Sequence, residues 1–103
     1  MNRGYYYTIT TAGSGTIAAT WTLPSRNNIR LNIYAGNPFA GQPNPAALPP
    51  PGGSLASNSG NVTVLTATTG VTGPGTYSIY FYNQGSAIGS STATVTYVKA
   101  PCP

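Results

Sequence analysis

Apolar and polar side chains alternate along most of this chain, and short runs of Gly, Pro, Asn and Ser interrupt the alternation. The clearest case is residues 16–23, where Ile17, Trp21 and other apolar residues share one face and mostly threonines share the other. A period of two is typical of a strand with one buried face and one face in water. Because no segment shows the period of a helix, the pattern predicts an all-β protein.

The alternating segments predict six strands. They cover residues 5–10, 16–23, 29–35, 61–68, 76–83 and 91–98, with turns expected between them, including one at 24–28. Short strands at this spacing, without helices, are typical of two antiparallel sheets packed face to face. We therefore predict one domain, residues 1–103, that forms an antiparallel two-sheet, jelly-roll-like β-sandwich of about six to eight strands. We expect the centre of its core to contain Trp21, Ile33, Ile79, Phe81 and Val95.

One segment breaks this rhythm. Residues 37–57 hold six prolines, including the run Pro49, Pro50 and Pro51, and show no strand pattern. Loops of this length are unusual inside a compact domain and are often functional or disordered. Proline-rich stretches favour polyproline II and expose their carbonyl groups to aromatic grooves. The segment is therefore either a recognition element or an insertion without a role of its own.

The composition removes most catalytic chemistry. The chain has no Asp, no Glu and no His, and its charged residues are Arg3, Arg26, Arg30 and Lys99. Acid–base catalysis by a carboxylate or an imidazole is excluded, as are carboxylate sites for calcium or magnesium and histidine sites for zinc. Serine and threonine are plentiful, but they lack a general base. We expect no enzyme activity, no cofactor and no metal.

The net charge of +4 comes from missing acids and not from an excess of bases. Phosphate binding usually needs several neighbouring cations, and the four basic residues form no such cluster. We therefore do not expect nucleic acid as a partner. Acid unfolding comes largely from protonating paired carboxylates, so a chain without carboxylates should tolerate strong acid. The alternative is compositional drift in a secreted protein rich in Thr and Asn.

Two residues are candidates for covalent modification. Cys102 is the single cysteine, so it cannot form a disulfide within the chain; it is either idle or joins two chains. Asn61 begins an Asn-Val-Thr sequon, which is either a glycosylation site or plain strand sequence. The chain has no apolar run of the ~20 residues that a membrane span needs. Its first residues lack the apolar region of a secretory leader, so we expect a removed leader or another route of export.

Several aromatic side chains are expected on the faces opposite the core. Aromatic rings on a flat sheet stack on sugars or collagen-like chains, or anchor protein interfaces. The alternative is that the second sheet or the proline-rich segment covers them. With residues of that segment, the interface candidates are Tyr5, Tyr6, Tyr34, Tyr80, Tyr82, Phe39, Pro49, Pro50 and Pro51.

The order of these motifs resembles the bacterial pre-peptidase C-terminal domain. The similarity lies in residues 4–9, 16–21, 30–34, 73–83 and 92–97, which is most of the chain outside the proline-rich segment. The resemblance implies a secreted, non-catalytic, jelly-roll-like sandwich of the kind appended to peptidases; related domains on clostridial collagenases bind collagen and use calcium. This chain departs from the family where acidic residues are expected, because it has Arg30 and Asn32 there. Calcium dependence is therefore not carried over, and the peptidase is absent.

Two functions remain. The first is a structural subunit of an extracellular or particle surface, such as a filament, a surface layer or a virion. It would pack against copies of itself or a neighbouring protein, with strand addition through residues 5–10. The second is an accessory module of a secreted hydrolase that binds collagen-like protein or polysaccharide. The mass of the protein in solution separates the two.

Overall fold

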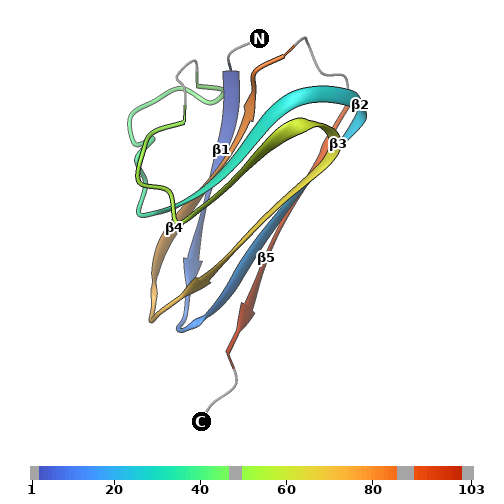
Figure 1. Cartoon of the computed structure of the whole chain (residues 1–103). Helices are drawn as coiled ribbons and strands as arrows, with labels where there is room; N and C mark the ends of the chain where they lie inside the picture. Colours follow the sequence, from blue (N-terminus) through green and yellow to red (C-terminus); the bar gives the residue numbers. More distant parts are fainter. Residues whose placement is uncertain (1–2, 47–49, 86–89, 101–103) are drawn as a thin grey trace.

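The computed structural model describes residues 3–46, 50–85 and 90–100, and these ranges contain strands and no helix (Figure 1). The all-β prediction is therefore confirmed. Five strands were found: β1 (Arg3–Thr11), β2 (Gly15–Ala35), β3 (Ala56–Val71), β4 (Gly75–Asn83) and β5 (Thr92–Lys99). All strand pairs are antiparallel.

The strand count is lower than the six to eight expected, because two predicted strands are one. Residues 16–23 and 29–35 belong to β2, which continues through the turn expected at 24–28. There the pairing with β3 shifts: Thr22 lies opposite Val64, but Asn27 lies opposite Val62. Extra residues in one strand bend it and increase its local twist. The Pro and Asn residues that suggested a turn therefore mark a bend inside a strand.

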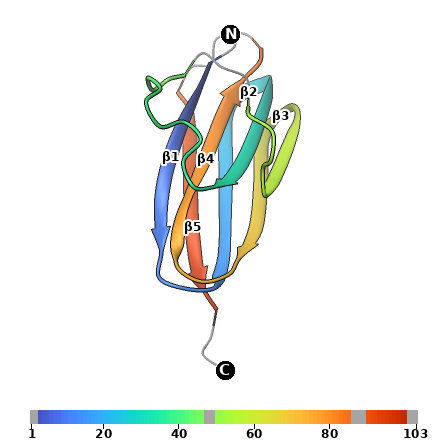
Figure 2. The ribbon, with the colours of Figure 1, turned by 90° about the vertical axis from the view of Figure 1, so that its left-hand side faces the viewer.

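The long strand β2 holds the sheet together. The strand order is β1-β4-β2-β3, with β5 also paired to β2. On one side β2 pairs with β3 along both of its halves; on the other, residues 15–22 pair with β5 and residues 29–35 with β4. Figures 1 and 2 show β2 and β3 curving together, so that the sheet folds back over itself.

The main core lies inside this folded sheet and receives side chains from both halves of β2. Trp21 and Phe81 meet edge to face, with ring centroids 5.6 Å apart. Four of the five residues expected at the centre are buried; Val95 is only partly buried and packs against the core. The buried cluster consists of Ile17, Ala19, Trp21, Leu23, Ile29, Leu31, Ile33, Leu65, Ala67, Val71, Tyr77, Ile79 and Phe81.

A second buried cluster lies on the other face of β2 and β4. It contains Tyr34, Tyr80 and Tyr82 from the strands, with Phe39 and Ala46 from the segment between β2 and β3. This segment, residues 36–55, is called the proline-rich loop below. Figure 2 shows its first part, in green, folded beside β1 and β4. The loop therefore covers one face of the sheet.

Candidate functional site

Three of the tyrosines expected on an exposed face are buried beneath the proline-rich loop. Tyr80 is fully buried, and Tyr34 and Tyr82 are nearly so. Phe39 of the loop is also fully buried, with its ring centroid 4.5 Å from that of Tyr80. The alternation assigned these side chains to the correct face, away from the main core. Their expected exposure was wrong because the loop covers them, which is the alternative that the sequence left open.

Tyrosine hydroxyl groups bind the carbonyls of this loop. The Tyr34 hydroxyl donates to the Pro51 carbonyl over 2.7 Å, and the Tyr80 hydroxyl donates to that of Ala46 over 3.3 Å. Tyr6 stacks on Phe39 at 5.0 Å and donates its hydroxyl hydrogen to the Gln42 carbonyl. The sequence analysis considered that the carbonyl groups of this loop could bind aromatic residues. In the structure, the aromatic residues that bind them belong to the same chain.

Burial changes the acidity of one of these groups. It raises the pKa of Tyr34 from 10.0 to about 12, and the positive charge of Arg30 opposes part of this rise. Removal from water disfavours the charged phenolate, whereas a nearby cation favours it. Tyr34 is therefore a neutral hydrogen-bond donor over the whole physiological pH range.

The same loop closes half of the outer edge of β1. Gly4 exchanges two backbone hydrogen bonds with Ala46, of 2.9 and 2.8 Å. The side chain of Asn44 imitates a neighbouring strand, because it accepts from the Tyr6 N–H (3.2 Å) and donates to the Tyr6 carbonyl (2.9 Å). A side chain at Gly4 would not fit, since its Cβ would lie 2.6 Å from Cε1 of Tyr80.

The other half of this edge is open. In a strand, the backbone N–H and C=O groups of every second residue point to the same side. The backbone groups of Gly4 and Tyr6 point away from β4, so the backbone groups of Thr8 and Thr10 do so too. Among the described residues, none outside the strand pairs hydrogen-bonds to Thr8 or Thr10 through the backbone. Both side chains are exposed. β1 therefore offers a short stretch of unpaired edge.

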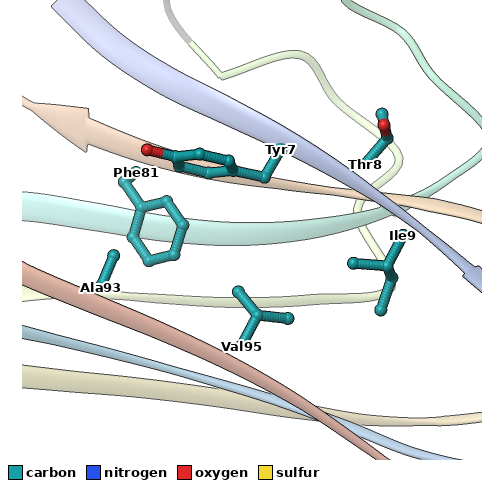
Figure 3. Close-up of a pocket in the computed structure, with 6 residues that line it drawn as sticks. All are labelled: Tyr7, Thr8, Ile9, Phe81, Ala93 and Val95. Carbon is teal, nitrogen blue, oxygen red and sulfur yellow. The ribbon is translucent and has the colours of Figure 1, made fainter.

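An apolar groove of about 320 Å³ runs beside this open stretch (Figure 3). Its lining comes from three strands: Tyr7, Thr8 and Ile9 of β1, Phe81 of β4, and Ala93 and Val95 of β5. Tyr7 is 49% exposed although its ring meets Phe81 edge to face at 5.8 Å. The groove lies where the edges of β1 and β5 approach each other without pairing.

The groove offers shape and backbone hydrogen bonds, and no carboxylate, imidazole or amine lines it. None of its six lining residues is charged, and the only charged residue of β1 is Arg3, at the far end of the strand. The described part of the chain contains no group of side chains that could hold a metal ion. The arrangement is suited to an extended, uncharged segment that pairs with β1 and places apolar side chains in the groove.

The remaining candidates are dispersed. Tyr5 is 51% exposed on β1, and Pro50 and Pro51 are partly buried. Asn61 is exposed on β3, opposite Asn28 of β2. Pro49 and Cys102 lie outside the described residues. The site that the structure brings together is the groove. The sequence analysis proposed residues 5–10 for strand addition and named Phe81 and Val95 for the core, but it did not place these segments side by side.

A signal for this site was present in the sequence. The run Tyr5-Tyr6-Tyr7 places two tyrosines on one face of β1, and pairing with β4 sets Tyr5 opposite Phe81 and Tyr7 opposite Ile79, on the core side. Polar-tipped rings on the core side of a strand are typical of an edge, where the hydroxyl can reach water. The sequence analysis proposed strand addition through residues 5–10, and the strand order confirms that β1 is an edge; the missing information was that β5 lies beside this edge and forms a groove with it.

The described ranges contain no helix of the length and apolarity that a bilayer crossing requires. Comparison of the chain with protein-family models, with curated proteins and with solved structures found no match.

Proposed function

We propose that this protein is a non-catalytic structural subunit that assembles by packing against copies of itself or a neighbouring protein. One observation carries the proposal: an unpaired, uncharged stretch of edge strand lies beside an apolar groove. Exposed strand edges bind further strands readily, so proteins usually cover or charge them. Here the loop covers one half of the β1 edge and leaves the other half accessible.

The surface of the molecule supports close contact between copies. Four charged residues in 103 give little long-range repulsion, and their absence from the groove removes the desolvation cost of burying a charge. The tyrosines first expected to form the interface serve the loop instead. Assembly is therefore proposed to use the β1 edge, with Tyr5 and Tyr7 at its rim.

We place this subunit at an extracellular or particle surface, in a filament, a surface layer or a virion. The support is the composition, since a surface built from Thr, Asn and Ser keeps its charge as the pH of the surroundings falls. We also interpret the folded sheet as a variant of a two-sheet, jelly-roll-like sandwich in which β2 and β3 belong to both sheets. The main core between the two halves supports this interpretation.

The mass of the native protein in solution tests the proposal. We expect light scattering after size exclusion to give a mass that rises with concentration, and electron microscopy to show regular assemblies. Because no Asp, Glu or His lines the groove, the assemblies should persist between pH 7 and pH 2. A mass that stays at 10.5 kDa at every concentration and pH would contradict assembly.

The exposed rings of Tyr5 and Tyr7 favour a second candidate function. Rings at 51% and 49% exposure beside a groove can stack on a sugar or a collagen-like chain, as an accessory module of a secreted hydrolase requires. This function predicts a monomer that sediments with insoluble collagen or glycan. The variant Tyr5→Ala/Tyr7→Ala should then lose the binding, whereas Val64→Ala, at a similarly exposed site on β3, should keep it.

A further inference from the structure

We infer that the open stretch of β1 pairs with the same stretch of a second copy, around a two-fold axis at Ile9. This inference rests on the proposed function and adds the partner strand and the register. β1 pairs with β4 on one side only, and its other side is closed by Ala46 and Asn44 at Gly4 and Tyr6. A new strand can therefore reach β1 only beyond Tyr6.

The closed half of the edge fixes the register. Thr8 and Thr10 are the residues of β1 beyond Tyr6 whose backbone groups point away from β4 and lie inside the strand. In an antiparallel pair of identical strands, Thr8 of each copy then lies opposite Thr10 of the other, and Ile9 lies opposite Ile9. Thr8 of each copy and Thr10 of the other point toward each other, and two residues in this arrangement exchange two backbone hydrogen bonds. The two Thr8–Thr10 pairs of the interface therefore form about four hydrogen bonds.

The side chains of the added strand fit the groove. Tyr7 and Ile9 face the core side of the sheet, as their partners Ile79 and Tyr77 do. In this register Ile9 of the second copy lies beside Ile9, and Thr11 of the second copy lies beside Tyr7, so both continue this face next to the groove. The pairing thus covers the half of Tyr7 that is exposed in a single chain. Each copy fills the groove of the other, as a two-fold interface requires.

Charge and shape favour β1 over the other edges. Arg3 is the only charged residue of β1, and antiparallel pairing at residues 7–11 sends the two copies of Arg3 to opposite ends of the interface. β3 is also an edge, but it bends where its pairing with β2 shifts, and a bent edge resists pairing. β5 ends at Lys99, so pairing along the whole of this strand would bring a charge into the interface.

Two charge variants test the register directly. Thr8 and Thr10 side chains are exposed, so Lys and Glu should be accepted there without loss of the fold. In Thr8→Lys/Thr10→Lys, like charges face each other twice across the two-fold axis; in Thr8→Lys/Thr10→Glu, opposite charges do. We expect the dissociation constant, measured by analytical ultracentrifugation, to differ by roughly tenfold between the two variants, the Lys/Glu variant binding more tightly.

A matched control separates register from net charge. Thr16→Lys/Thr22→Lys adds the same two charges at exposed sites of β2, and its dissociation constant should stay near that of the unmodified protein. Amide hydrogen exchange gives a second readout: the Thr8 and Thr10 amides should become protected as concentration rises. Those of Tyr7 and Ile9, which face β4, should not change.

The outcomes distinguish this inference from the proposed function. If the protein associates but Thr8→Lys/Thr10→Lys binds as the control does, the β1 pairing is wrong and assembly uses another surface. The same holds if association leaves the exchange of Thr8 and Thr10 unchanged. If the unmodified protein stays monomeric at every concentration, both the pairing and the proposed assembly are wrong.

Discussion

At the scale of single residues, the proline-rich loop depends on a few aromatic contacts. Phe39 is the only large apolar residue of the described loop that is fully buried, and it touches Tyr6, Tyr34 and Tyr80. The hydroxyls of these three tyrosines also donate hydrogen bonds to carbonyls of the loop. An intramolecular hydrogen bond contributes about 1 kcal/mol net, so each of these bonds supports the closed position of the loop.

The raised pKa of Tyr34 predicts that the free energy of unfolding falls at alkaline pH. Its pKa is 10.0 in the unfolded chain and about 12 in the folded one, so the folded state holds the proton more tightly. This contribution is fully present below pH 10 and is lost as the pH rises through 12, by up to roughly 2 kcal/mol.

Denaturant unfolding of the unmodified protein and of Tyr34→Phe between pH 9 and pH 12 measures this contribution of Tyr34 to the free energy of unfolding. At pH 9 we expect the variant to be less stable by about 1 kcal/mol, because the bond to Pro51 is absent. The difference should shrink as the pH rises above 10 and change sign as the pH approaches 12, because the loss in the unmodified protein then exceeds the contribution of the bond. A constant difference at all pH values would show that Tyr34 does not titrate in this way.

At the scale of elements, one side chain decides how much of β1 is an edge. Asn44 occupies both backbone groups of Tyr6, and Ala46 occupies those of Gly4. Without these contacts the open edge would run along most of the strand. Strand edges of that length are sites of uncontrolled aggregation. The loop therefore limits the accessible edge to the stretch beside the groove.

Replacing Asn44 by Ala should release this part of the edge. We expect the Tyr6 amide to exchange much faster with solvent, and the free energy of unfolding to fall by roughly 1 kcal/mol. The neighbouring variant Gln42→Ala is the control, because the Gln42 contacts use its backbone carbonyl and amide. Equal protection of the Tyr6 amide in both variants would contradict the role assigned to Asn44.

At the scale of the whole molecule, stability does not rest on ionised side chains. The chain has no Asp, Glu or His, which are the side-chain types that ordinarily change charge between pH 2 and pH 7. Folded and unfolded chains therefore bind the same number of side-chain protons between pH 7 and pH 2. The pH slope of stability is the difference between those two numbers, so it should be close to zero.

Thermal unfolding at pH 7 and at pH 2, in the same salt concentration, checks this expectation. We predict that Tm changes by no more than about 5 °C, which corresponds to roughly 1 kcal/mol for a domain of this size. A large drop in Tm in acid would mean that the absence of carboxylates does not protect the fold.

The sequence by itself determined the all-β class and the face on which most side chains of each strand lie. The alternation in residues 16–23 places Ile17 and Trp21 in the core and leaves Thr16 and Thr22 exposed, as observed. This works because successive residues of a strand point to opposite faces wherever the strand lies. The composition likewise excluded carboxylate and imidazole chemistry, since that depends only on which side chains are present.

Only the tertiary structure decided what covers each face and where the sheet ends. Tyr80 and Thr22 both point away from the main core, yet the loop buries Tyr80 and leaves Thr22 in water. Tyr7 and Ile79 share a face and are paired, but Tyr7 is half exposed because β1 is an edge. Strand order, the continuation of β2 through its bend and the position of the loop depend on contacts between residues far apart in the chain. Local alternation carries no information about those contacts, so the groove beside β1 could be found only in the folded molecule.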